Sequence, residues 1–421
     1  MASEKSISVT PWLSRALHRI RTTPPRIIAS PRTQPRRAAV AILIRIVPGS
    51  SCPPPPAAQT AQPSLSEFFQ QEWVNAPDAQ PEILFLKRDT PSPEEAVVSQ
   101  PRARRNEAHV AFPGGRTESD DEGGMYTALR QTWEEIGIDL AEKNYMCIGQ
   151  LDDREITTSL GKRLLMILSP FVFLQVTPQA PPPDPIPSTT LHWTPLASLV
   201  SPQRPPKWST VTVDAASRLA PKHSVALKLL VRVLVGSMEF PAIIIEPSFS
   251  TPPAQDPSVL KLWGLSLGMT LDLMSYMILP TNEYPNYNSP SMADVKVAGD
   301  LPRESRASSP LGNVMNLPYH TPEALRMEVV APSLASVFPR FSYPDVNFWI
   351  WVFGKRYREV VRGWEASIRS GGVNDRRINW SGQALSTFYA SIRKALVVVI
   401  VARALAIIFG LAFAGWWIFS S

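Results

Sequence analysis

Cysteine is scarce in this chain of 421 residues, and the scarcity excludes two classes of protein. With Cys52 and Cys147 alone, the chain can build neither a disulfide framework nor a cysteine-rich zinc module. Acid is scarce near the start, where residues 1–37 carry eight Lys and Arg against Glu4. Because the net charge of +6 is concentrated there, it gives little support to nucleic-acid binding, and we expect no nucleic-acid partner.

Residues 1–36 also lack the apolar core of a secretory signal peptide. Their basic, acid-poor composition is typical of a mitochondrial transit peptide, and Leu13, Leu17 and Ile20 could supply a short apolar face. Four prolines between positions 24 and 35 end any helix early. We therefore expect a basic, disordered N-terminal segment, with a targeting role as the alternative.

Proline, by contrast, is abundant: 44 residues, about twice the usual ~5 %. The 12 Trp and 16 Phe exclude wholesale disorder, so a folded part must coexist with Pro-rich loops. Apolar runs of strand length alternate with helical periods between residues 37 and 280, which predicts an α/β domain of the α/β/α sandwich type with a mixed sheet. The strands are expected at 38–47, 83–87, 109–112, 164–175, 190–193 and 242–246, and the helices at 122–136, 224–235 and 260–277.

Beyond that domain, three further segments differ in composition. Residues 281–344 are rich in Pro, Ser and Asn and are expected to be a low-complexity linker; residues 345–394 form a basic segment with an amphipathic helix over 346–368. Residues 395–419 are an apolar run without proline and with the single charge of Arg403. A helix of that length crosses a ~30 Å hydrocarbon core, whereas buried helices of soluble proteins usually have shorter apolar runs.

The flanks of the apolar run predict its orientation in a lipid bilayer. Arg393 and Lys394 precede it, and Trp416 and Trp417 lie near its far end, as in a membrane interface belt. Arg403 lies about two turns inside, close enough to snorkel. We expect a single-pass C-terminal anchor with the folded domain facing the cytosol; peroxisome, mitochondrion and endoplasmic reticulum all stay open as the membrane.

The segment Phe112–Ile138 carries the chemistry. Gly114 and Gly115 form a turn that lets the backbone approach a ligand, and Ser119 with Glu122 predicts a capping box at the start of a helix. Gln131, Glu134 and Glu135 lie near one face of that helix, where adjacent carboxylates favour a hard divalent cation. Residues expected on the packing side are Met125, Ala128, Leu129, Trp133 and Ile136.

This segment resembles the Nudix box, G-x5-E-x7-R-E-U-x-E-E-x-G-U, in which U is a bulky aliphatic residue. The matching positions are Gly115, Arg130, Glu134, Glu135, Gly137 and Ile138. Gln131 stands where the family has its first helical glutamate, and Thr132 where it has an aliphatic residue. The loop has one extra residue, so counting from the glycine selects Asp121 as the loop acid, and counting back from the arginine selects Glu122.

The longer loop is similar to that of the coenzyme A diphosphatase branch of the Nudix family. Leu84–Arg88, a basic loop with Arg102, Arg104 and Arg105, and then Phe112-Pro113 echo a signature upstream of the box. Further echoes are Ser169–Val172, His192–Leu196 and Leu262–Ser266. For the three loop arginines, contact with an adenosine phosphate and a solvated loop are equally open interpretations.

The resemblance implies hydrolysis of a diphosphate linked to another moiety, with coenzyme A or acyl-coenzyme A as the expected substrate. Mg²⁺ or Mn²⁺ would be held by Glu134 and Glu135 with Asp121 or Glu122, and Arg130 would orient the carboxylates. Gly114, Gly115 and the three loop arginines would contact substrate. The general base is not identified; the acids nearest in sequence are Glu118, Asp152, Asp153 and Glu155.

Two other hypotheses follow from the same residues. Because an amide can neither bind a metal as an anion nor act as a base, Gln131 favours a weakly catalytic Nudix domain that serves as a membrane-tethered nucleotide-binding module. The basic segment 345–394 could instead act on anionic lipid, which we expect to be an accessory surface contact.

Overall fold

A computed structural model of the protein describes residues 9–30, 36–53, 62–88, 107–157, 164–200, 206–215, 225–246, 259–277, 339–360, 363 and 380–420. The strands are β1 (Arg37–Val47), β2 (Gln80–Arg88), β3 (Glu107–Ala111), β4 (Gly114–Arg116), β5 (Tyr145–Gln150), β6 (Arg154–Thr157), β7 (Leu164–Gln175), β8 (Thr189–Pro195), β9 (Trp208–Asp214), β10 (Ser237–Ile245), β11 (Val259–Trp263) and β12 (Arg340–Phe341). The helices are α1 (Thr10–Thr22), α2 (Leu65–Gln70), α3 (Gly124–Ile136), α4 (Leu196–Val200), α6 (Val225–Val235), α7 (Gly264–Ser275), α10 (Pro344–Phe353) and α12 (Trp380–Ser420).

The described strands form one mixed sheet around β1. Its main path runs β12-β10-β11-β3-β2-β1-β7-β5, with β4, β6, β8 and β9 paired to it at the sides. β1 is parallel to β7, with Ile42 opposite Val172, and antiparallel to β2, with Ile44 opposite Ile83. The expected mixed sheet is confirmed.

Helices cover both faces of this sheet. Successive side chains of a strand point to opposite faces, and β1 follows that rule. Ile42 and Ile44 belong to a core that includes residues of α1, α2, α4 and α7. Ala41 and Leu43 pack on the opposite face, beside Ala128, Leu129 and Ile136 of α3. The α/β/α layering expected from the sequence is therefore confirmed.

The N-terminal segment is not disordered over residues 10–22. Pro11 stands in the first turn of α1, and the helix ends just before the prolines that follow. Leu13, Leu17 and Ile20 are fully or almost fully buried, and Ile20 lies against Gly149 of β5. The apolar face suggested by the sequence is thus part of the main core.

A second core surrounds the first half of α12. The α12 residues buried there are Ala384, Phe388, Ile392, Ala395, Leu396 and Val399. They pack with Val346 and Ile350 of α10, Met238 of β10 and Phe341 of β12. The folded part therefore does not end near residue 280, because β12 and α10 lie within or next to the expected linker. Residues 281–338 of that linker lie outside the described residues.

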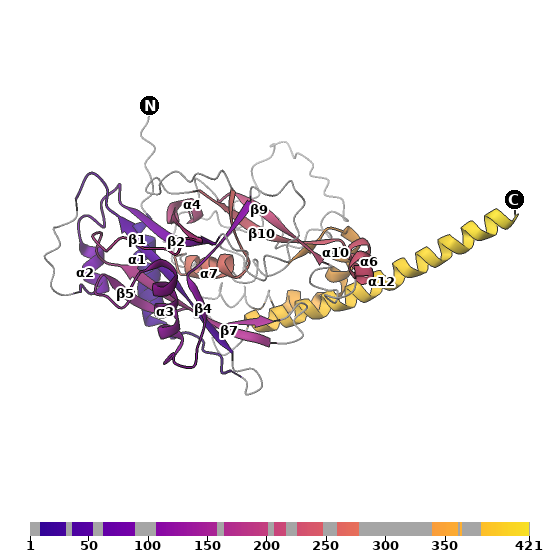
Figure 1. The fold of residues 1–421 in the computed structure, drawn as a ribbon, viewed down its shortest axis with the longest axis horizontal. Helices are drawn as coiled ribbons and strands as arrows, with labels where there is room; N and C mark the ends of the chain where they lie inside the picture. The colour runs from indigo at the N-terminus through magenta and orange to yellow at the C-terminus, as the bar shows by residue number, and fades with distance from the viewer. Residues whose placement is uncertain are drawn as a thin grey trace, which may run out of the picture.

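The second half of α12 projects away from the rest of the molecule as a rod (Figure 1). The helix is long and apolar enough to cross a membrane. Val399 is buried, whereas the large apolar residues from Leu405 onward are about half or more exposed. Arg403 lies at the transition: its Nη2 donates to both oxygens of Asp345 at 2.8 and 2.6 Å. The sequence predicts that Arg403 snorkels to the membrane interface and does not predict its ion pair with Asp345.

Two predicted helices have different bounds in the structure. The interval Leu260–Met277 is divided between β11, which is parallel to β3, and α7. The helix expected over 346–368 is α10, followed by a helical stretch at 355–360, with most later residues outside the described part. The apolar run that starts at Leu260 does not by itself distinguish a buried strand from a helix.

Candidate functional site

The site is built on the turn between β3 and α3. Gly114 has φ 151°, and a Cβ there would lie 2.4 Å from the carbonyl oxygen of Ala39 and 2.7 Å from Cα of Val40. β4 pairs antiparallel with β1 at these same residues. Only glycine allows this close approach, so Gly114 fixes the turn against the central strand.

Helix α3 begins at Gly124, two residues later than expected, and the predicted capping box is absent. The N-cap is Gly123, without a side-chain cap, and Ser119 Oγ donates to Asp120 instead. The helix ends at Gly137, which has φ 66° and donates its N–H to the Trp133 carbonyl at 2.9 Å.

The packing side of α3 was predicted only in part. Ala128 and Ile136 are buried and Leu129 packs beside them, whereas Met125 is 45 % exposed and Trp133 59 % exposed. Thr127 and Thr132 complete the buried side. Met125 and Trp133 are eight residues apart, about 12 Å along the helix axis, and both side chains face outward.

Arg130 joins the loop acid to the helix. Its Nε and Nη2 each donate to one oxygen of Asp121 at 2.8 Å, and Nη2 also donates to the carbonyl of Arg116 at 3.2 Å. Asp121 accepts further bonds from the backbone N–H of Glu118 and from Thr127 Oγ1, and its side chain is 1 % exposed. These bonds, led by those from Arg130, hold the pKa of Asp121 well below its usual range, and the Asp121 carboxylate raises the pKa of Arg130.

The two candidate loop acids have different environments. Asp121 is the partner of Arg130, whereas Glu122 is exposed. Either acid is expected to join Glu134 and Glu135 as a metal ligand. Both oxygens of Asp121 already accept hydrogen bonds from Arg130, and Oδ2 also accepts from Thr127 Oγ1 and from the backbone N–H of Glu118.

Glu134 is the open carboxylate of the site. Arg130 Nη1 donates to its two oxygens at 3.1 and 3.2 Å, and Gln131 Nε2 donates to Oε2 at 3.0 Å. The Glu134 side chain is still 53 % exposed. A Cβ on Gly115 would lie 2.0 Å from Gln131 Oε1, so Gln131 fills the space over this glycine. Gln131 therefore orients Glu134 while packing against the turn.

Glu135 faces a different partner. Arg88, at the end of β2, binds it with two parallel hydrogen bonds; the Nη2 bond to Oε2 is 2.7 Å long and the second joins Nε to Oε1. Glu135 is 12 % exposed. Arg88 belongs to the upstream segment that resembles the coenzyme A branch. Its pairing with Glu135 of the box is not predicted by the sequence. The pair links α3 to the sheet.

The expected metal ligands do not gather into one set. Among the residues that the structure describes, no three His, Cys, Asp or Glu side chains form a group that could hold a metal ion. Glu134 and Glu135 are hard oxygen donors at adjacent positions, with the first open to solvent and the second bound by Arg88. Gly115 lies against the side chain of Gln131, and Gly114 lies against Ala39 and Val40 of β1. Arg102, Arg104 and Arg105 lie outside the described residues.

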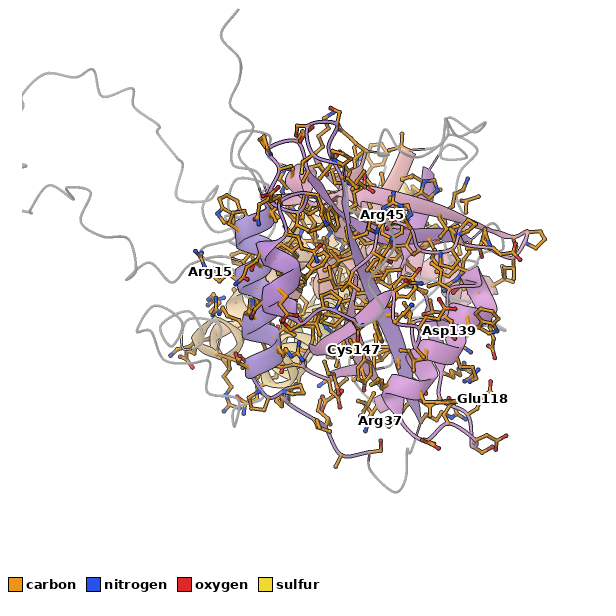
Figure 2. All side chains as sticks on the ribbon, turned by 90° about the vertical axis from the view of Figure 1, so that its left-hand side faces the viewer. Arg15, Arg37, Arg45, Glu118, Asp139 and Cys147 are labelled. Atoms are coloured by element: carbon orange, nitrogen blue, oxygen red, sulfur yellow. The ribbon has the colours of Figure 1, made fainter. Side chains whose placement is uncertain are left out.

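The acids considered as general bases have separate environments. Glu118 is 66 % exposed and accepts from Arg130 Nη1 at 3.3 Å, so it lies at the site. Asp153 is fully buried and binds Arg37 Nη2 at 2.7 Å, and Asp152 accepts from the backbone of Arg26. Figure 2 shows Glu118 and Arg37 toward the end of the molecule opposite Arg45. Glu155 lies in β6, opposite Ile167 of β7. Of the four acids, Glu118 is the one whose described contacts join an exposed carboxylate to Arg130 of the box.

A buried polar cluster at the Arg45 end was missed by sequence reasoning. Arg45 donates to Glu82 Oε2 from Nε at 2.9 Å and from Nη2 at 2.7 Å, and its guanidinium lies 3.8 Å from the centre of the Trp193 ring. Glu82 is fully buried. The cluster connects β1, β2 and β8, and the strand expected at 190–193 is β8, which extends to Pro195.

The chain is similar over part of its length to known proteins, one of which is a coenzyme A diphosphatase. No family model matches the chain. An uncharacterized protein of Schizosaccharomyces pombe is 29 % identical over 262 residues, which is 60 % of this chain and 69 % of that protein. The mitochondrial coenzyme A diphosphatase NUDT8 of Mus musculus is 34 % identical over 76 residues, 18 % of this chain and 36 % of its own length.

Solved structures similar to this chain include two of Nudix proteins. A Nudix hydrolase from M. smegmatis, RenU, is 15 % identical with a TM-score of 0.22, and the match covers 38 % of this chain and 71 % of that one. A MutT/nudix family protein from Enterococcus faecalis is 15 % identical with a TM-score of 0.21, and the match covers 46 % of this chain and 57 % of that one. Our assignment of the fold therefore rests on the sheet order and the two cores described above.

Proposed function

We propose that this chain is a Nudix hydrolase that cleaves the diphosphate bond of a nucleoside diphosphate linked to another moiety, with coenzyme A or acyl-coenzyme A as substrate. The observation that carries the proposal is the assembled box. Arg130 connects Asp121 to Glu134, beside a Gly114-Gly115 turn fixed on β1. The short similarity to the mouse coenzyme A diphosphatase supports the choice of substrate.

Mg²⁺ or Mn²⁺ fits the donor set at Glu134 and Glu135. Both side chains offer carboxylate oxygens, and Mg²⁺ commonly takes one or two protein carboxylates together with substrate phosphates. The metal would neutralise phosphate charge and lower the pKa of a bound water. Arg130 and Gln131 orient Glu134, Arg88 holds Glu135, and Glu118 is positioned to accept a proton at the edge of the site.

The proposal is tested by incubating the purified protein in detergent with coenzyme A, acyl-coenzyme A, ADP-ribose and NADH, each with Mg²⁺ or Mn²⁺. We expect 3′,5′-ADP and a phosphopantetheine product from the first two. Products from ADP-ribose or NADH alone would contradict the coenzyme A assignment and leave the Nudix chemistry in place. Metal-dependent hydrolysis of none of the four would contradict the enzyme.

The second candidate is a nucleotide-binding module without turnover. It is favoured by Gln131, which supplies an amide where the family has a carboxylate, and by the engagement of Glu135 with Arg88. Under this alternative, calorimetry detects Mg²⁺-dependent binding of a coenzyme A analogue while no product forms.

We further propose that α12 anchors the protein in a membrane with the folded domain on the cytosolic side. The apolar length of α12 supports a span, and Arg393 and Lys394 on the domain side support the orientation. Two experiments on separate samples test this. After carbonate extraction of cell membranes, the protein should stay in the membrane pellet. When sealed vesicles are treated with protease, the domain should be digested without added detergent.

A further inference from the structure

Helix α6 carries an apolar stripe that no described residue covers. Val225 is 81 % exposed, Leu229 62 % and Val233 61 %. These residues are four apart, so they form one line along the helix. Soluble monomers expose single apolar residues freely, whereas a continuous row marks a surface with a partner.

The stripe lies next to the place where α12 leaves the domain. Arg403 Nη1 donates to the carbonyl of Leu234, the residue that follows Val233, and the hydroxyl of Tyr343 donates to the carbonyl of Val233 at 3.1 Å. Figure 1 shows α6 and α10 beside α12 at the base of its projecting half. The end of α6 and the emerging tail thus form one continuous surface.

Arg403 sets the depth of the span. Its guanidinium binds both oxygens of Asp345 and lies 4.4 Å from the centre of the Tyr343 ring. An arginine at the centre of a bilayer is unfavourable, and this ion pair holds Arg403 at the domain instead. The apolar residues that project beyond the domain therefore begin at Ala404.

Where a membrane span begins at the surface of a folded domain, apolar parts of that surface can enter the lipid interface. The α6 stripe offers such an apolar surface at the base of the tail, and interfacial helices insert an apolar face ~5–10 Å deep.

We infer that the α6 stripe is immersed in the lipid interface, so that the domain rests on the bilayer rather than hanging from a flexible tether. The inference goes beyond the proposed hydrolase activity and rests only on α12 as the anchor. Its occupant is the lipid of the same bilayer, because the stripe is continuous with the tail that enters it. A second copy of this chain on the stripe is the competing outcome.

The test places one fluorescent probe at a time in the full-length protein in phosphatidylcholine–phosphatidylserine vesicles. In a Cys52→Ser, Cys147→Ser background, NBD is attached at Leu229→Cys, at Ile27→Cys as the matched control, or at Ile408→Cys on the tail. Ile27 is 68 % exposed and lies on neither α6 nor α12. Quenching is measured with aqueous iodide, with headgroup-labelled nitroxide lipid and with acyl-labelled nitroxide lipid.

We expect the Leu229 probe to be shielded from iodide and quenched severalfold more by headgroup-labelled lipid than the Ile27 probe is. The Ile408 probe should be quenched by acyl-labelled lipid. Free access of iodide to Leu229, with Ile408 still quenched, overturns the inference and leaves the anchor standing. A Leu229 probe shielded from iodide but not quenched by lipid also overturns it and indicates a second copy. An unquenched Ile408 probe overturns the anchor and the inference together, and the hydrolase assay is independent of all three.

Discussion

Around Arg130 the described contacts join polar groups that are close in sequence, whereas around Arg403 they join segments that are far apart. Arg130 reaches Asp121 and Glu134 across nine and four residues. Arg403 reaches Asp345 across 58 residues and Leu234 across 169. Contacts between residues close in sequence can be predicted from the spacing of a motif, whereas the contacts of Arg403 depend on the fold, in which the first half of α12 belongs to a core.

The comparison is tested most strongly by two truncations. A chain ending at Lys394 loses Ala395, Leu396 and Val399 from the second core, whereas a chain ending at Arg403 keeps them. Burying Leu or Val contributes ~1.5–3 kcal/mol each, so the shorter chain should lose about 3–6 kcal/mol. Scanning fluorimetry in detergent should show a lower Tm for the shorter chain and an unchanged Tm for the longer one. Equal Tm values for the two truncations would show that the second core is not part of the fold.

The polar network around α3 predicts a smaller effect that depends on pH. Asp121→Asn breaks a nearly buried ion pair with Arg130, which costs about 3 kcal/mol at pH 7. Because the pKa of Asp121 is lowered in the folded protein, its stabilising effect is complete above the unfolded pKa of ~3.9 and is lost as the pH falls toward the folded value.

The measurement is urea unfolding of the wild type and Asp121→Asn between pH 7 and pH 3. The gap in free energy of unfolding should be constant down to about pH 4 and should narrow below it. The exposed neighbour Asp120→Asn is the matched control and should stay within ~0.5 kcal/mol of the wild type. A gap that widens with acid would contradict the assigned direction of the shift.

The smallest expected effect concerns Gln131. Restoring a carboxylate with Gln131→Glu should raise the apparent affinity for Mg²⁺ severalfold, since a third acid strengthens a hard-cation site. The variant loses the amide that donates to Glu134, which limits the gain. Titration of activity with Mg²⁺ gives the result, with Gln70→Glu at an exposed position of α2 as the control. An unchanged or weaker Mg²⁺ affinity would show that Gln131 does not face the metal.

Much of the sheet and half of the site could be predicted from the sequence. The run at 38–47 and the run at 164–175 are apolar over most of their length, and they correspond to β1 and β7 nearly residue for residue. Arg130, Glu134 and Gly137 were placed by spacing alone. The pairing of Glu135 with Arg88 was not, because it depends on how α3 crosses the end of β2.

The features that the sequence does not predict share one physical cause: each depends on contacts between segments that are far apart in the sequence. The apolar face of α1 is short and flanked by charge, so its burial depends on the sheet that receives it. Likewise, the run 395–419 is apolar on both sides of Arg403, so its composition does not show that Ala395, Leu396 and Val399 pack in a core while the later residues project. No local pattern around Asp345 predicts its ion pair with Arg403, which forms because the fold brings the two residues together.

The most direct test of the account compares the turnover of Glu134→Gln with that of the wild type. Glu134 is the open carboxylate of the box and is half exposed, so the fold should survive its replacement. With saturating Mg²⁺ and coenzyme A, we expect turnover to fall by about 100-fold or more, a loss of ~2.7 kcal/mol of transition-state stabilisation. Glu72→Gln, an exposed acid outside the site, should leave turnover unchanged. A fall of less than about threefold, ~0.65 kcal/mol, with an unchanged Tm would contradict the assignment of this site.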